Sequence, residues 1–77
     1  MIKDDDILEK FRIFGANVKK CREKADMTIK ELSKTTGIRE HYLRRIEKGD
    51  CKGISISQVY LLADNLNVPP HELCEGI

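Results

Sequence analysis

The 77-residue chain is 40% hydrophobic and 35% charged and has two Pro and five Gly, which fits one small folded domain, residues 1–77, and excludes collagen-like, low-complexity and wholly disordered chains. Three cysteines without CxxC spacing indicate neither a disulfide framework nor a metal site, so we expect reduced thiols. Residues 1–6 are acidic where a signal peptide is basic, and no apolar run approaches the ~18 residues of a membrane span, so we expect a cytoplasmic protein.

The net charge of +1 conceals a separation of charge along the chain. Residues 1–9 carry a net charge of −3, residues 10–52 carry +7, and residues 53–77 carry −3. A concentrated basic stretch favours binding to phosphate groups, and the acidic ends reduce indiscriminate binding to polyanions. Charge alone favours an ordinary solvated surface over a nucleic-acid-binding one, so the choice between the two depends on the sequence motifs.

The first predicted element is an amphipathic helix whose large apolar residues are spaced alternately four and three apart. They are Ile7, Phe11, Phe14, Val18, Cys21 and Ala25. The helix should end near residues 24–26. We expect the acidic residues 1–6 to form an N-terminal extension, a solvated tail or cap, with Asp6 able to start the helix.

A second, short helix is predicted to begin at a capping box. The Thr28 hydroxyl can accept from the backbone three residues on, while Glu31 reaches back to the amide of Thr28. Leu32 should point inward. Gly37 should end this helix, because glycine readily adopts the left-handed conformation found at helix C-termini.

A third helix is predicted over about residues 39–48, with Leu43 and Ile46 on its inner side and Gly49 as its C-terminal signal. A fourth helix follows, capped by Ser55 or Ser57. Its apolar residues are Val59, Leu62, Ala63 and Leu66, and Asn67 is expected near its end. The prolines at 69–70 begin a short fifth helix. With no alternating strand of useful length, the predicted class is all-α.

Two short helices joined by a tight glycine-containing turn form a helix-turn-helix, here at about residues 28–48, whose second helix enters the DNA major groove. Candidate base-reading residues are Arg39, Glu40, His41, Arg44 and Arg45. Candidate phosphate contacts are Thr28, Lys30, Tyr42, Lys48 and Lys52, with Thr28 and Lys30 offering backbone N–H groups at a helix N-terminus.

The ordered motifs resemble the XRE family, the phage Cro and repressor type of helix-turn-helix domain, over about residues 14–74. They include MTIKELS at 27–33, TGIREHYLRRIEKG at 36–49 and LLADNLNV at 61–68. The resemblance implies a compact five-helix, lambda-repressor-like domain that binds double-stranded DNA as a homodimer. It points to Glu40, His41 and Arg45 as base readers, to Tyr42 and Lys48 as phosphate contacts, and to a structural ion pair of Arg22 with Glu47.

Three departures from the family pattern matter. Ile29 replaces the usual Gln that meets phosphate and braces the reading helix. Arg39 replaces the usual Ser or Thr cap of the third helix, which gives up about 1 kcal/mol of capping unless another group supplies it. The loop after Gly49 is one residue longer than usual, which affects Cys51 and Lys52.

We therefore predict a sequence-specific transcriptional regulator, expected to be a repressor, with no enzyme activity, cofactor, metal or membrane partner. The dimer contact should come from the fourth and fifth helices, where Leu73, Cys74 and Ile77 add apolar surface, or from the N-terminal extension. The alternatives are an antitoxin, a restriction–modification controller, or a protein-interaction module that keeps this fold. Salt dependence separates DNA binding from the last of these.

Overall fold

The computed structural model describes residues 4–51 and 53–77, and within these ranges all regular structure is helical. The helices are α1 (Asp4–Lys24), α2 (Ile29–Thr36), α3 (Glu40–Lys48), α4 (Ile56–Leu66) and α5 (Pro70–Leu73). The prediction of an all-α, five-helix class is confirmed.

Helix α1 begins earlier than the apolar pattern indicates. It starts at Asp4, so Asp4, Asp5 and Asp6 belong to its first turns, and the prediction of a separate tail over these residues is wrong. The Asp6 carboxylate, which is exposed in the first turns, interacts favourably with the helix dipole and helps to account for a start without apolar residues. Residues 1–3 lie outside the described residues.

Local capping signals fix most of the other boundaries. The capping box of Thr28 with Glu31 is present, and Ser55, rather than Ser57, caps α4 through a second box with Gln58. Gly37 adopts the predicted left-handed conformation, with φ 77°. Gly49 and Asn67 end α3 and α4 in the same way.

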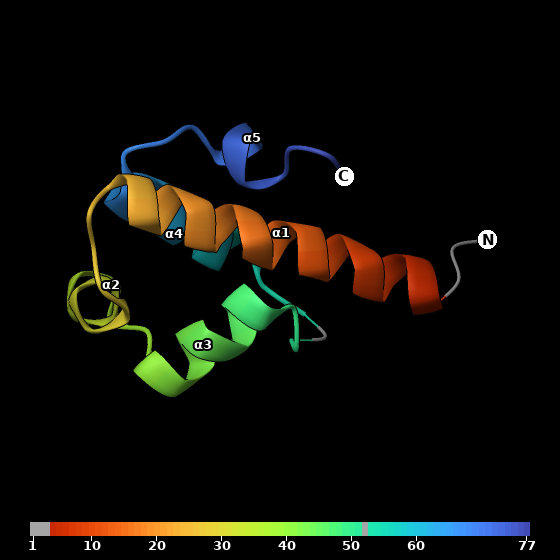
Figure 1. Ribbon diagram of the computed structural model, residues 1–77, viewed down its shortest axis with the longest axis horizontal. Helices are drawn as coiled ribbons and strands as arrows, with labels where there is room; N and C mark the ends of the chain where they lie inside the picture. Colours follow the sequence, from red (N-terminus) through yellow and green to blue (C-terminus); the bar gives the residue numbers. More distant parts are fainter. Residues whose placement is uncertain (1–3, 52) are drawn as a thin grey trace.

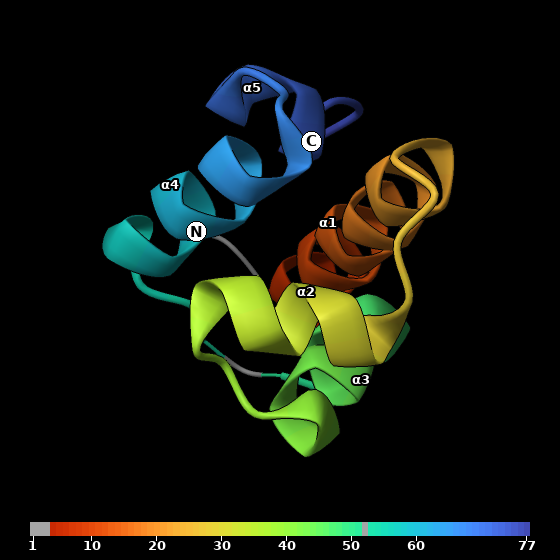
Figure 2. The same cartoon turned by 90° about the vertical axis from the view of Figure 1, so that its left-hand side faces the viewer.

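The long helix α1 forms the spine of the molecule, which measures 38 × 23 × 20 Å. Helix α5 lies on one side of it and α3 on the other, and α4 runs behind it in this view (Figure 1). Helix α2 crosses beneath the C-terminal end of α1 and lies next to α3 (Figure 2). The N-terminal turns of α1 extend beyond the other helices. This arrangement leaves the far side of α2 and α3 uncovered.

The core fills the space between α1 and the other four helices. Its fully buried members include Val18, Leu32, Leu43, Leu62 and Leu73. Burial raises the pKa of the Cys21 thiol, so this residue packs as a small apolar group, as predicted. Leu73 has 0% exposure, so it is not available for a dimer contact, and that prediction is wrong. Cys74, which was expected to add apolar surface, is exposed.

Candidate nucleic-acid interface

The outward face of α3 presents polar and basic side chains opposite its buried residues Leu43 and Ile46. Arg39, His41, Arg44, Arg45 and Lys48 are exposed, and Glu40 is half-buried. An open hollow of about 390 Å³ runs along this face, lined by His41, Arg44, Arg45, Lys48 and Asp50. The structure thus brings His41, Arg44 and Arg45 of the predicted base readers onto one surface, whereas Arg39 and Glu40 do not line the hollow. Asp50 adds an acidic group to this surface that the sequence did not indicate.

Two weak ion pairs hold some of these groups in place. Arg44 Nη2 lies 3.4 Å from Glu40 Oε1. Arg45 Nε donates to the backbone oxygen of Asp50 at 3.2 Å and lies 4.0 Å from its Oδ2. These four side chains are 40–79% exposed, and pairs in contact with solvent stabilise a protein by only about 0–1 kcal/mol. A nucleic acid can therefore displace them at little cost.

The start of α2 can receive a phosphate, but not through the amide of Thr28. That amide donates to Glu31 Oε1 at 3.0 Å, and the Thr28 hydroxyl accepts from the Glu31 amide at 3.0 Å. Within the described ranges, the amides of Ile29 and Lys30 have no acceptor. The N–H groups available at this helix N-terminus are therefore those of Ile29 and Lys30.

Arg22 connects α1 to both helices of the motif. Its Nε lies 2.7 Å from Glu47 Oε2, its Nη2 donates to Glu47 Oε1 at 3.2 Å, and its Nη1 donates to the Met27 carbonyl at 2.7 Å. The two side chains are only 12% and 8% exposed. Hydrogen bonding to the Glu47 carboxylate raises the pKa of Arg22, so the guanidinium stays charged. The Arg22 guanidinium thereby fixes the positions of α3 and of the segment before α2 relative to α1.

Two glycines let α1 and α3 touch through their backbones. A Cβ on Gly15 would lie 2.0 Å from the carbonyl oxygen of Ile46, and one on Gly49 would lie 2.6 Å from the Cα of Arg12. A side chain at either position would push the reading helix outward. Sequence analysis overlooked Gly15, because no turn signal marks a glycine within a helix.

The turn between α2 and α3 is also fixed by side chains. The buried Thr36 hydroxyl donates to the Leu32 carbonyl at 2.7 Å and accepts from the Ile38 amide at 3.2 Å. The Ser33 hydroxyl donates to the Ile38 carbonyl. With Gly37 in the left-handed conformation, these bonds define the angle between the two helices.

Tyr42 supports the loop after α3. Its hydroxyl lies 3.3 Å from Cys51 Sγ and 3.4 Å from the Gly53 carbonyl, and Cys51 Sγ donates to that carbonyl at 3.1 Å. The hydrogen bond with Cys51, and then burial, raise the pKa of Tyr42. A phosphate contact by Tyr42 would share a hydroxyl already used in the fold. Lys52 lies outside the described residues.

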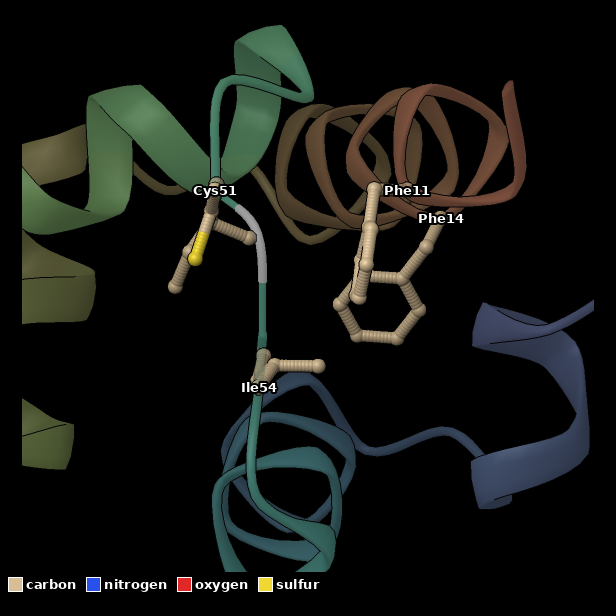
Figure 3. A pocket seen from close by; sticks show the side chains of 5 residues that line it. Phe11, Phe14, Cys51 and Ile54 are labelled. Atoms are coloured by element: carbon tan, nitrogen blue, oxygen red, sulfur yellow. The ribbon is translucent and has the colours of Figure 1, made fainter. Parts of the chain in front are cut away.

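Beneath this loop, Phe11 and Phe14 of α1 approach Ile54 across a narrow apolar gap (Figure 3). Ile46 and Cys51 complete its lining, and it is too narrow for a water molecule. The gap is therefore a packing seam rather than a ligand site. In the described part of the chain, no group of three or more His, Cys, Asp or Glu could hold a metal ion. No described helix is long and apolar enough to cross a bilayer.

Comparison with known proteins adds two findings. The helix-turn-helix family profile matches residues 18–73, which is 56 of the 77 residues. A solved structure, the restriction–modification controller protein C.AhdI from Aeromonas hydrophila, aligns with a TM-score of 0.79 at 23% identity, covering 84% of this chain and 97% of that one. No curated protein sequence matches. The structural likeness supports the fold, and the family match covers the elements described above.

Proposed function

Because the chain belongs to the XRE-type helix-turn-helix family, we propose that it is a sequence-specific DNA-binding transcriptional regulator that inserts α3 into the major groove. In this proposal, the chain is one helix-turn-helix domain that acts in the cytoplasm. It is carried by one observation: α3 is fixed to α1 by a buried ion pair and by backbone contact, while its opposite face holds exposed basic donors.

On the outward face of α3, His41, Arg45 and Lys48 follow one another at intervals of four and three, which forms a strip along the helix. His41 and Arg45 would lie deepest in the groove, and Lys48 would lie near its edge. Arg39, Glu40 and Arg44 flank it and complete the proposed base-reading set, in which Glu40 can accept from cytosine N4. Lys48, Lys52, Tyr42 and the amides at the start of α2 would hold phosphates on the two sides of the groove.

Substitutions at Arg45 and Lys48 test this division between base contacts and phosphate contacts. The Arg45 guanidinium can contact guanine O6 and N7 together, which discriminates bases by about 1–3 kcal/mol. Arg45→Ala should therefore relax preference at one position of each half-site. Lys48→Ala should weaken binding to all DNA sequences alike and reduce the slope of log affinity against log salt by about one unit per contact. Equal losses on a matched site and its single-base variants for Arg45→Ala would place Arg45 on the backbone.

The proposed regulator is a repressor that binds as a two-fold dimer, since one reading helix covers few base pairs and half-sites lie about one helical turn apart. A restriction–modification controller is the second candidate, because the solved structure that shares this fold is of such a protein. A reporter gene placed behind the bound site separates the roles: a repressor lowers its expression, whereas an activating controller raises it.

Selection of bound sites from random duplex DNA tests the central proposal. We expect an enriched motif with two-fold symmetry, bound with an affinity that falls steeply with salt because counterions are released from phosphate. Absence of any enriched motif, together with salt-insensitive capture of a protein partner, would replace DNA binding with the protein-interaction alternative.

A further inference from the structure

One face of α1 carries cations that no part of the proposed motif uses. Arg12, Gly15, Lys19 and Arg22 follow one another at intervals of three, four and three, so they lie along one strip of the helix. Gly15 touches the backbone of α3, and Arg22 binds Glu47 of α3. The strip therefore faces α3, and its two other members, Arg12 and Lys19, lie at the flank of the reading helix.

Arg12 lies directly beside the C-terminal end of α3. A Cβ on Gly49, the residue that follows Lys48, would be 2.6 Å from the Cα of Arg12. The Arg12 side chain is nevertheless 70% exposed, and Lys19 is exposed as well. The basic surface of α3 thus continues past Lys48 onto α1.

The Arg12 guanidinium is held only loosely in the free protein. Its Nη2 lies 2.6 Å from Glu9 Oε2, one turn earlier on the same helix, and the Glu9 side chain is 52% exposed. An exposed pair of this kind contributes little to stability. A guanidinium pairs with phosphate in the same bidentate manner as with carboxylate, so Arg12 can exchange one partner for the other.

We propose that Arg12 and Lys19 bind DNA backbone phosphates next to the base pairs read by α3, which extends the DNA footprint from the helix-turn-helix onto α1. This inference rests on the proposed function, because it assumes that α3 lies in the major groove. It adds a contact strip outside the helix-turn-helix itself, on the helix that supports it.

The test compares two double variants with the same change in charge. Arg12→Gln with Lys19→Gln removes the proposed strip. Lys20→Gln with Lys24→Gln removes two cations that line a hollow beside Glu72, on another face of α1. Thermal unfolding should show that both variants fold, since the four side chains are exposed. The probe is the site selected from random DNA, extended by one helical turn on each side.

Each phosphate contact contributes about 0.9 to the slope of log affinity against log salt, so the strip variant should lose about two units of slope per half-site, or about four on the two-fold site. Base preference should be unchanged, and the control variant should keep the parent slope. Trimming the duplex flush with the selected site should reduce the parent slope but leave the slope of the strip variant unaltered.

An unchanged slope for the strip variant, or an equal loss in the control variant, would overturn this inference while leaving DNA binding by α3 intact. Failure of the parent protein to select any site would instead remove the proposed function on which it rests. A loss of base preference at one position would assign Arg12 or Lys19 to a base edge, which contradicts phosphate binding.

Discussion

Glu47 is the residue whose change should affect stability most through charge. Its carboxylate and the Arg22 guanidinium are both buried, so Glu47→Gln leaves a cation without its partner. Breaking a buried pair costs on the order of 3–5 kcal/mol, which is a large part of the stability of a small domain. We expect the melting temperature to fall by more than about 10 °C, at roughly 4–8 °C per kcal/mol.

The matched control is Glu40→Gln on the same helix. Its partner Arg44 is 3.4 Å away, and the Arg44 and Glu40 side chains are 58% and 40% exposed, so the melting temperature should stay near that of the parent. Similar unfolding of the Glu47 and Glu40 variants would mean that the Arg22 pair contributes no more than a surface contact.

Stability should depend on side-chain size at position 15 as strongly as it depends on charge at position 47. Gly15→Ala would place a methyl group 2.0 Å from the Ile46 carbonyl, so the two backbones must separate. Overpacking of this kind costs about 1–3 kcal/mol or more, and the displaced α3 should also bind DNA more weakly. Gly53→Ala is the control, since nothing lies within 4 Å of its Cβ position. Calorimetric unfolding of both variants measures the difference.

At the scale of elements, α3 lacks a side-chain cap. Arg39 occupies the cap position with extended backbone angles, φ −62° and ψ 142°, and makes no capping hydrogen bond. Arg39→Ser should supply that bond and stabilise the protein by about 1 kcal/mol. If Arg39 meets DNA as proposed, the same change should weaken site binding, so stability and affinity should move in opposite directions. A variant that melts higher and binds DNA equally well would remove Arg39 from the interface.

Local signals predicted the elements well where the responsible atoms lie within one turn of each other. The capping box at Thr28 and the glycine at 37 needed only their own neighbours. The start of α1 was misplaced because acidic residues carry no apolar period, although they suit a helix N-terminus. The apolar period also included Ile7 and Ala25, which are both exposed. Ile7 lies in the N-terminal turns of α1 that extend beyond the other helices, and Ala25 lies in the turn just after α1 ends.

Features that depend on packing between distant segments could not be predicted from the sequence. Leu73 looked like free apolar surface, but α5 folds back against α1, where Asn17 Nδ2 donates to the Leu73 carbonyl at 3.0 Å. The engagement of Tyr42 with Cys51 likewise depends on how the loop after α3 closes. The face of α3 was accessible to prediction because one helical period separates its buried residues from its exposed ones.

At the scale of the whole molecule, the proposed dimer needs a surface that does not repel its own copy. Residues 54–63 contain no charged side chain, although 35% of the chain is charged. Within this stretch Ile56 and Tyr60 are 69% and 54% exposed, and they lie one turn apart on α4. A two-fold contact places the same patch on both partners, so this neutral surface on α4 replaces Leu73 as the proposed interface.

Ile56→Glu with Tyr60→Glu should therefore bring like charges together across the two-fold axis. Sedimentation should show a shift from dimer to monomer, and affinity for a palindromic site should fall toward that for a half-site. The melting temperature of the dissociated protein should change little, because both side chains lie outside the core. A parent protein that sediments as a monomer at high concentration would contradict the dimer itself.

The backbone contact between α1 and α3 at Gly15 has a consequence for the nucleic acid. With no side chain between the two backbones at Gly15, α3 has little freedom to tilt or slide to suit a given sequence. The adjustment must then come from the double helix, whose bending and twisting energies differ between base steps. Pyrimidine–purine steps, which kink most easily, should therefore be favoured between the half-sites, at positions that no side chain touches.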